Sequence, residues 1–193
     1  SEDGYEGRRP ATVDVAGTLE EDVKRRDLTI NGLAATADGT VIDHIGGVED
    51  LRLRRIRAIG APAIRFAEDY LRVLRAFRFA GAYDLAIEPE TLSSLREAVV
   101  HLDRLSAERV REEMLKVLSG DVPSRSLQMY AEFGALDGWY QEIAPAASGR
   151  GWTEALAAID ALKPHRVFLR VVRLSLCAGG EQEEAVKRAE ALL

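Results

Sequence analysis

The sequence has few of the residues that build metal clusters, disulfide scaffolds or membrane spans. It contains one cysteine, Cys177, and three histidines, His44, His101 and His165, among 193 residues. A single cysteine excludes a disulfide framework and a cysteine-based zinc site, and it fits a reducing compartment. No apolar run approaches the roughly 20 residues of a membrane span, and no basic segment followed by an apolar one opens the chain. We therefore expect a cytoplasmic protein without a membrane partner.

The chain also lacks an overall positive charge, since its formal net charge is −6. Positive charge is nevertheless concentrated in residues 52–78, which hold eight arginines against two acids. The arginines are Arg52, Arg54, Arg55, Arg57, Arg65, Arg72, Arg75 and Arg78. Such a segment attracts phosphate, and arginine favours bidentate recognition. For Arg52, Arg54 and Arg55 the alternative is a solvated face balanced by acids elsewhere.

Residues 63–80 predict one amphipathic helix that carries acids and arginines on its polar side. At about 3.6 residues per turn, two sets of side chains separate onto opposite sides. The polar set is Arg65, Glu68, Asp69, Arg72 and Arg75, and the apolar set is Phe66, Tyr70, Val73, Leu74 and Phe77. One side of this helix is therefore expected to pack and the other to bind.

Asp69 and Arg72 have complementary hydrogen-bonding chemistry. The carboxylate only accepts and the guanidinium only donates, so together they fit a base with an amino group beside a ring-nitrogen acceptor. Cytosine and adenine have this edge. Uracil and guanine would leave the carboxylate and the guanidinium without partners, at a cost of about 1–3 kcal/mol of binding free energy for each group. The alternative is an exposed helical ion pair worth about 0.2–0.5 kcal/mol.

Two further motifs precede this helix. They are the segment Arg25-Arg26-Asp27-Leu28-Thr29-Ile30-Asn31 and the segment 43–51, Asp-His-Ile-Gly-Gly-Val-Glu-Asp-Leu. With Glu68-Asp69 and Arg72, and with weaker matches at 7–10 and 106–110, residues 4–120 resemble the bacterial-type (class II) tRNA nucleotidyltransferase and poly(A) polymerase family. Members of that family add C and A, or A alone, to RNA 3′ ends.

The resemblance implies ATP or CTP as substrate, RNA as partner, with the tRNA 3′ end favoured, and a set of nucleotide-binding residues. It assigns the base to Asp69 and Arg72, the phosphates to Arg26, Arg75 and Arg78, the sugar side to Asp27 and Asn31, and a helper role to Arg109. The chemistry of the side chains agrees with these roles. Asp27 can accept a hydrogen bond from a ribose hydroxyl, and Arg26 can donate two parallel hydrogen bonds to a phosphate. Alternatively, Lys24, Arg25 and Arg26 are the basic end of a short helix that begins near Thr18.

In the same family the second motif forms a flexible spring between head and neck, here Asp43, Gly46, Gly47 and Asp50. Paired glycines give the backbone freedom to bend or to adopt positive φ, so a tight turn is an equally good interpretation. Asp43 and Asp50 could brace that turn through backbone N–H groups.

Metal-binding carboxylates are missing from this pattern. Nucleotidyl transfer needs divalent metal held by close acids, and the family places an Asp-x-Asp motif upstream of every motif found here. We therefore expect Mg²⁺ to be bound by residues outside this chain, and the chain alone to be a fragment without activity. Asp14 is either an accessory acid or the outward residue of an edge strand.

The expected fold is mostly α with a small N-terminal α/β remnant. Residues 1–60 would be the C-terminal part of a nucleotidyltransferase head with short strands at 11–15, 41–45 and 55–59; 61–120 a helical, base-reading neck; and 121–193 a partial helical body. After Pro62 no further strand is expected. The predicted helices are 63–80, 90–100, 106–118 with Ser106 as its cap, 124–133, 151–162, 165–177 and 181–193.

Two positions depart from the family pattern. Tyr70 stands where proline is common after the Glu-Asp pair, which suggests that the helix already runs through Asp69. Gly32 replaces the usual alanine after Asn31 and should loosen a helix there by about 0.5–1 kcal/mol.

Three functions remain open from the sequence. The first is template-independent addition of C and A to RNA 3′ ends, in which this chain selects the nucleotide. The second is bacterial poly(A) polymerase activity, and the third is a non-catalytic nucleotide- or RNA-binding relative.

Overall fold

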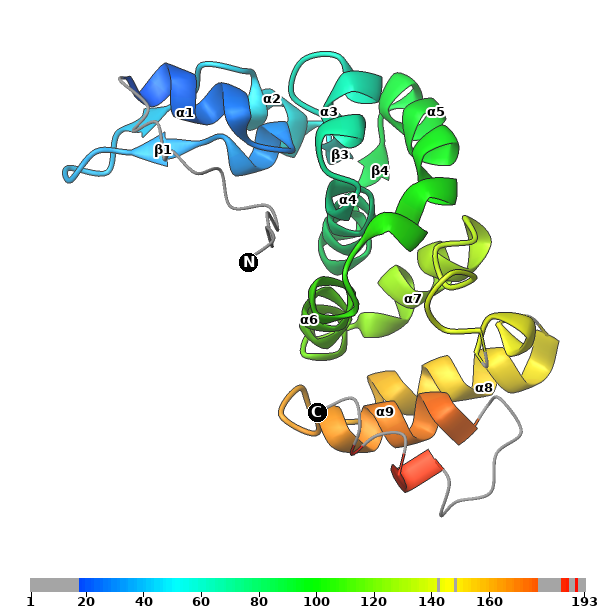
Figure 1. Cartoon of the computed structure of the whole chain (residues 1–193). Coiled ribbons are helices and arrows are strands. Elements are labelled where there is room, and N and C mark those ends of the chain that lie inside the picture. The colour runs from blue at the N-terminus through cyan, green and yellow to red at the C-terminus, as the bar shows by residue number, and fades with distance from the viewer. Residues whose placement is uncertain (1–17, 142, 148, 177–184, 188–189, 191–193) are drawn as a thin grey trace, which may run out of the picture.

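The fold is a curved series of helices that leads from a small mixed region to a helical end (Figure 1). The computed structural model describes residues 18–141, 143–147, 149–176, 185–187 and 190. The expected strand at 11–15, Asp14, the motif at 7–10 and most of the expected helix at 181–193 lie outside the described residues.

The N-terminal region is built from short elements. They are α1 (Leu19–Arg25), the 3₁₀ turn η1 (Thr29–Asn31), β1 (Ala34–Ala35), β2 (Val41–Ile42), α2 (Gly47–Arg52) and β3 (Arg55–Ile56). Helix α1 begins at a capping box in which Thr18 and Glu21 exchange side-chain and backbone hydrogen bonds, so the short helix of the alternative interpretation, with acids first and bases last, is present. Strands β1 and β2 pair antiparallel. The strands expected at 41–45 and 55–59 are present but reach only two residues each.

A fourth strand corrects the expectation that strands end before Pro62. Strand β4 (Ala86–Ile87) pairs in parallel with β3, with Arg55 opposite Ala86 and Ile56 opposite Ile87. This pair ties the end of the N-terminal region to the chain that follows α4. Two residues are too few for an alternating pattern to predict a strand. The strand forms because it pairs with β3, which is distant in sequence.

The rest of the described chain is helical. The elements are α3 (Pro62–Glu68), α4 (Leu71–Tyr83), α5 (Pro89–Ala98), η2 (Val99–Arg104), α6 (Ala107–Leu118), α7 (Pro123–Glu132), η3 (Ala144–Ala146), α8 (Gly149–Asp160) and α9 (Val167–Leu176). The mostly α fold class is therefore confirmed. Ser106 stands at the N-cap position of α6, but its hydroxyl makes no capping hydrogen bond. None of the described helices is long and apolar enough to cross a membrane.

The single helix expected at 63–80 is wrong, because it is two helices with a break at Asp69 and Tyr70. Asp69 is extended, with φ −160° and ψ 105°, and α4 begins at Leu71. The expectation that Tyr70 lets the helix run through Asp69 is wrong for the same reason. The break turns Asp69 toward residues that a straight helix could not bring to it.

Helix α4 is fixed against the body by its apolar side. Val73, Phe77 and Ala80 are fully buried, and Phe77 stacks on Phe133 with ring centroids 4.9 Å apart. At Gly81 a side chain would lie 2.4 Å from Ser126 Oγ, so a residue without Cβ lets α4 approach α7 closely. The opposite side of α4 is left to carry its arginines.

A buried arginine joins the helices on the two sides of residue 120. Arg170 on α9 is fully buried, and its Nη1 donates to the carbonyl oxygens of Leu118 and Gly120, each at 2.6 Å. Its Nη2 donates to the carbonyl oxygen of Leu162. Arg170 thus satisfies carbonyl groups that the ends of α6 and α8 leave open. The partition into 1–60, 61–120 and 121–193 stays a prediction.

Candidate nucleotide-binding site

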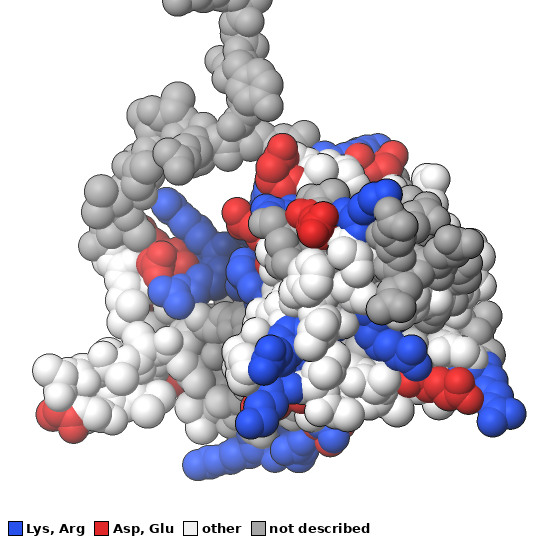
Figure 2. Space-filling view, turned by 90° about the horizontal axis from the view of Figure 1, so that it is seen from below, with Lys and Arg blue, Asp and Glu red and all other residues white. Residues whose placement is uncertain are grey.

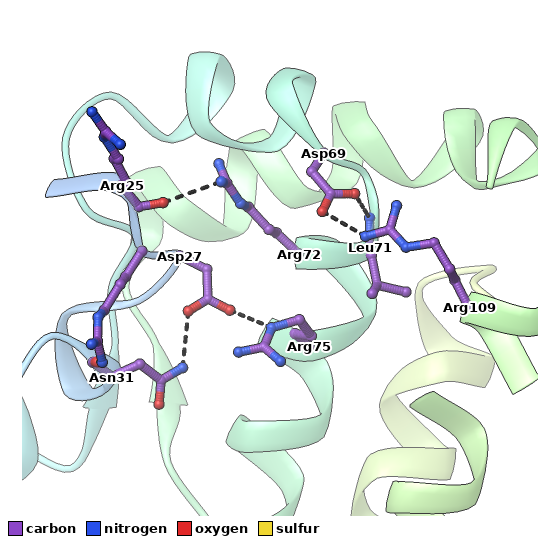
Figure 3. A pocket seen from close by; sticks show the side chains of 9 residues that line it. Arg25, Asp27, Asn31, Asp69, Leu71, Arg72, Arg75 and Arg109 are labelled. Carbon is purple, nitrogen blue, oxygen red and sulfur yellow. Dashed lines mark hydrogen bonds and ion pairs between the residues drawn. The ribbon is translucent and has the colours of Figure 1, made fainter. Parts of the chain in front are cut away.

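A cavity of about 390 Å³ lies between the N-terminal region, the α3–α4 break and α6 (Figure 3). Its lining residues are Arg25, Arg26, Asp27, Asn31, Asp69, Leu71, Arg72, Arg75 and Arg109. The structure therefore brings together the first motif, the third motif and the helper residue, which are up to 84 positions apart in sequence. Five of the nine residues are arginines, so the site suits an anionic ligand.

Asp69 occupies the break and links its two ends. Its Oδ1 accepts from the backbone N–H of Leu71 at 3.1 Å, and its Oδ2 accepts from Arg109 Nη2 at 2.7 Å. Burial alone would raise the pKa of Asp69, but the hydrogen bonds from Arg109 and Leu71 outweigh it and hold the pKa below its ordinary value. Asp69 is thus a charged acceptor held in a fixed direction.

Arg72 lies beside Asp69 but takes other partners. Its Nη1 donates to the Arg65 carbonyl oxygen at 2.9 Å and also to a Glu68 carboxylate oxygen. Its Nη2 donates to the Arg25 carbonyl oxygen at 3.2 Å, which fastens α4 to the end of α1. The ion pair that the sequence suggested between Asp69 and Arg72 is therefore replaced by Asp69 with Arg109 and Glu68 with Arg72.

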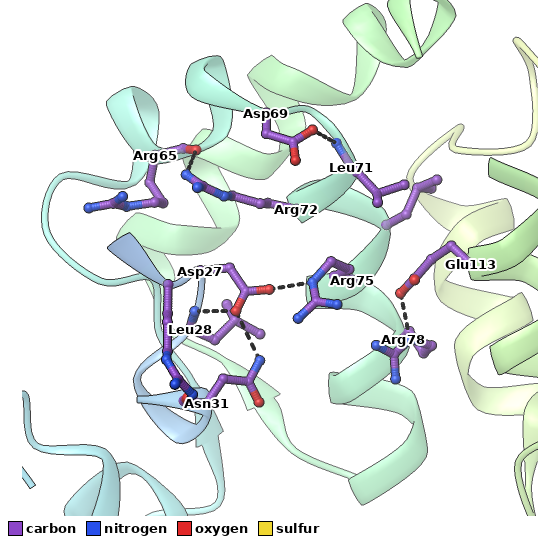
Figure 4. A network of polar contacts seen from close by, with 12 residues as sticks. Asp27, Leu28, Asn31, Arg65, Asp69, Leu71, Arg72, Arg75, Arg78 and Glu113 are labelled. Carbon is purple, nitrogen blue, oxygen red and sulfur yellow. Dashed lines mark hydrogen bonds and ion pairs between the residues drawn. The ribbon is translucent and has the colours of Figure 1, made fainter. Parts of the chain in front are cut away.

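Asp27 is the most buried acid of the pocket, with 6% of its surface exposed. Its Oδ1 accepts from Leu28 N at 2.9 Å and from Asn31 Nδ2 at 3.0 Å, and its Oδ2 accepts from Arg75 Nε at 2.6 Å (Figure 4). Burial raises the pKa of Asp27, and these hydrogen bonds lower it further than burial raises it. Asp27 thereby holds Arg75 with its two terminal nitrogens unbonded among the described residues.

Arg26 is held at the edge of the pocket. Its Nη2 pairs with Asp22 at 2.8 Å and its Nη1 donates to the Asn31 carbonyl oxygen at 2.9 Å. About half of the Arg26 side chain stays exposed. A phosphate would compete with Asp22 for this guanidinium.

Arg78 does not line the pocket. It pairs through Nε with Glu113 of α6 at 2.5 Å, and Glu113 is fully buried (Figure 4). Its guanidinium also lies 4.1 Å from the ring centroid of Phe79. The partners found here connect α4 to α6, and a phosphate contact by Arg78 stays a prediction.

Sequence reasoning missed Arg25 and Leu71 as pocket residues. Arg25 could have been found, because it is the first residue of the motif that supplied Arg26 and Asp27. Leu71 carries no signal, since its place in the pocket follows from the break at Asp69.

The turn at 43–47 is braced as the sequence indicated. Both carboxylate oxygens of Asp43 accept backbone N–H groups, those of Ile45, Gly46 and Gly47 at 2.9–3.1 Å and that of Val48 at 2.9 Å. Gly46 has φ +79°, which favours glycine. The segment is therefore a tight turn that begins α2, and a hinge role stays a prediction.

Asp50 braces α2 by a different route from the one expected. It is fully buried and accepts from Thr29 Oγ1 at 2.6 Å, from Arg57 Nε at 2.8 Å and from Arg55 Nε. These are side-chain donors, not backbone N–H groups. Two arginines of the basic segment thus neutralise a buried acid and do not line the pocket.

Two glycines lie at crowded positions beside the first motif, and the stricter constraint is at Gly47, where the neighbouring atom belongs to the backbone. A side chain at Gly47 would lie 2.3 Å from the Thr29 carbonyl oxygen, and one at Gly32 would lie 2.2 Å from Ile45 Cδ1. The expectation that Gly32 loosens a helix is wrong, because Gly32 ends a 3₁₀ turn at a crowded position.

The described residues do not fit a magnesium site. No group of three or more metal-binding side chains occurs among them, and Asp27 and Asp69 are both paired with arginine. Figure 2 shows a hollow on one face whose inner wall is mainly basic, and such a wall favours anions.

Two family models match the chain. Residues 1–57 match the poly A polymerase head domain, and residues 84–147 match the probable RNA and SrmB-binding site of polymerase A. The matches flank the α3–α4 break, so they cover both sides of the pocket.

Curated relatives are CCA-adding enzymes. The chain is 48% identical over 120 residues to that of Levilactobacillus brevis, covering 62% of this chain and 30% of the relative. It is 41% identical over 138 residues to that of Bacillus subtilis, covering 70% and 35%. The chain thus spans about a third of the length of these relatives.

Solved structures agree in fold. The CCA-adding enzyme of Bacillus stearothermophilus in complex with CTP is 25% identical with a TM-score of 0.60, covering 91% of this chain and 59% of that one. The Thermotoga maritima CCA-adding enzyme complexed with tRNA-CCA is 25% identical with a TM-score of 0.66, covering 90% and 44%. Both family models match, and the first and third motifs meet in one pocket, so the chain belongs to the tRNA nucleotidyltransferase and poly(A) polymerase family.

Proposed function

We propose that this chain selects the incoming nucleotide for template-independent addition of C and A to RNA 3′ ends, with tRNA as the RNA. The observation that carries the proposal is one cavity in which an acceptor, Asp69, and a donor, Arg72, lie beside four further arginines. No template strand is needed if protein side chains read the base edge.

The base would bind at the α3–α4 break. Asp69 is half-buried and charged, so it can accept from the amino group of cytosine or adenine. Arg72 can donate to the neighbouring ring nitrogen once the ligand replaces Glu68 as its partner. Uracil and guanine would instead present a carbonyl oxygen to the Asp69 carboxylate, and the unsatisfied group would cost about 1–3 kcal/mol of binding free energy.

The triphosphate and sugar would bind toward the first motif. Arg75 offers its terminal nitrogens to a phosphate while Asp27 fixes its Nε. Arg26 and Asn31 also line the cavity, and they lie next to each other because Arg26 donates to the Asn31 carbonyl oxygen. Asp27 already accepts three hydrogen bonds, so a ribose contact would use its remaining lone pair.

The metal-dependent step is not assigned to the described residues, because no group of three or more metal-binding side chains occurs among them. Support for nucleotide and RNA substrates comes from relatives whose structures contain CTP, or a primer tRNA with an incoming ATP analog. A cytoplasmic location rests on the single cysteine and stays a prediction.

Poly(A) polymerase activity is the second candidate, and one of the matching family models describes a poly A polymerase head domain. The two activities differ in whether C is incorporated. The test joins this chain to a head segment that carries the Asp-x-Asp motif of the family and supplies a tRNA without its 3′ CCA, magnesium and each labelled triphosphate in turn. We expect C and A to be added and U and G to be rejected. Addition of A alone would favour poly(A) polymerase, and equal use of all four nucleotides would overturn base reading by this pocket.

A further inference from the structure

Helix α4 continues past the nucleotide pocket as a row of basic and aromatic side chains. Arg75, Phe79 and Tyr83 recur at intervals of four, so they lie along the same side of the helix. The Arg75 guanidinium lies 5.5 Å from the Phe79 ring centroid, and the Phe79 and Tyr83 rings stack at 6.0 Å with 14° between their planes. The row begins in the pocket and ends at the last residue of α4.

Tyr83 is unusually open for an aromatic residue. It is 58% exposed, and its hydroxyl makes no hydrogen bond among the described residues. Phe79, by contrast, is partly buried against the core, so it supports Tyr83 from one side. Burial in the core therefore does not explain a large ring at position 83.

Positive charge accompanies the row at its far end. Arg54 Nη2 donates to the carbonyl oxygens of Tyr83 and Asp84, at 3.1 and 2.8 Å, and its side chain is 62% exposed. The nearby Asp84 carboxylate lies 3.7 Å from Arg54 and 3.9 Å from Arg125, so its charge is balanced. An anionic chain lying along α4 would therefore meet arginines at both ends of the aromatic pair.

We propose that Tyr83, supported by the Phe79 ring behind it, is a stacking platform for the unpaired 3′-terminal nucleotides of the RNA that receives the new nucleotide. Stacked aromatic rings flanked by arginines are the chemistry that binds single-stranded nucleic acid, because every base has a π face. Eight residues of helix separate Arg75 from Tyr83, a rise of about 12 Å. That rise corresponds to three or four stacked nucleotides at about 3.4 Å each. This inference rests on the proposed function, since it assumes that the RNA end approaches the nucleotide pocket.

The test uses a fluorescein-labelled RNA hairpin with four unpaired 3′ nucleotides and the same hairpin with a blunt end, with binding to this chain followed by fluorescence anisotropy. Wild type should bind the overhang hairpin more tightly. Tyr83→Ala and Tyr83→Leu should weaken that binding at least fivefold and leave the blunt hairpin unchanged, whereas Tyr83→Phe should bind like wild type. Val100→Ala removes another exposed apolar side chain, 70% exposed, and should change neither hairpin.

Three results would overturn the proposal: wild type that binds both hairpins equally, Tyr83→Leu that keeps full overhang binding, or Tyr83→Ala that instead converts an oligomer to a monomer in light scattering. The last would make the face a protein interface. Calorimetry with CTP on the same proteins separates this failure from failure of the proposed function. CTP binding that survives in Tyr83→Ala without any overhang effect would refute only the platform, whereas absence of CTP binding in wild type would refute the nucleotide pocket itself.

Discussion

Arg109 on α6 reaches across the pocket to Asp69 at the α3–α4 break, with 2.7 Å between Arg109 Nη2 and Asp69 Oδ2. The two residues are 40 positions apart in sequence, and about a third of each side chain is exposed. The contact orients the carboxylate that we assign to the base, so Arg109 acts on nucleotide choice through Asp69.

Replacing Arg109 by glutamine should weaken CTP and ATP binding about fivefold, equivalent to about 1 kcal/mol, because one charge-assisted hydrogen bond to a partly exposed carboxylate is lost. The preference for CTP over UTP should shrink in parallel. Isothermal titration calorimetry measures both. Arg150→Gln, at a side chain 93% exposed on α8, is the matched control and should bind like wild type. Unchanged selectivity in the Arg109 variant would remove Arg109 from nucleotide choice.

Gly47→Ala should destabilise the fold by about 1–3 kcal/mol, because the new methyl group meets the Thr29 carbonyl oxygen in a packed region. Gly151→Ala on α8 places its methyl group where no atom lies within 4 Å, and it should stabilise by about 0.5–1 kcal/mol. Urea denaturation of the two variants gives the comparison. Equal effects of the two substitutions would show that the approach of α2 to Thr29 is looser than the structure shows.

Asp43→Ala should cost about 0.5–2 kcal/mol of unfolding free energy, because the backbone N–H groups at the start of α2 lose their acceptor. Asp38→Ala removes an aspartate from the turn between β1 and β2, where it accepts from Thr40 N at 3.1 Å, and should stay within about 0.5 kcal/mol of wild type. Thermal unfolding followed by circular dichroism provides the measurement. If the two variants melt together, Asp43 is not what holds the turn.

Stability should fall in acid through Asp50. Burial raises the pKa of Asp50, but hydrogen bonds from Thr29, Arg55 and Arg57 lower it below its ordinary value. A lowered folded pKa means that the stabilisation is complete above the unfolded pKa of about 3.9 and is lost as pH falls through the lower folded value. Stability should therefore be level between pH 7 and 5 and decline below about pH 4.

Asp50→Asn tests this assignment. At pH 7 it should cost about 1–3 kcal/mol, because two arginines lose a charged partner but can still reach water. Its stability should also decline less steeply than that of wild type below about pH 4. Parallel acid curves for the two proteins would place the acid-sensitive group elsewhere.

The sequence predicted the helical elements well because most of them are amphipathic over ten residues or more. Helices α6 and α7 begin and end within one residue of the expected bounds, where Ser106 and Pro123 mark their starts. It predicted the pocket residues other than Arg25 and Leu71, because those seven belong to motifs with their own hydrogen-bonding chemistry.

The failures share a cause, which is contact between distant residues. The break at Asp69 is stabilised by Arg109 of α6, and local periodicity contains no trace of that bond. Strand β4 exists because it pairs with β3, some 30 residues earlier. Likewise, the sequence around Gly32 predicts only a weakened helix, whereas in the structure Gly32 is packed against the side chain of Ile45.

Base selection by the pocket is tested most directly by calorimetry with CTP, ATP, UTP and GTP on wild type and on Asp69→Ala. Wild type should bind CTP and ATP more tightly than UTP and GTP, by about fivefold or more for each group that a wrong base leaves unsatisfied. Asp69→Ala should reduce that preference without a large loss of melting temperature, because half-buried Asp69 lies in the break between α3 and α4 and is not part of the apolar core. Equal affinity of wild type for all four triphosphates would contradict the account.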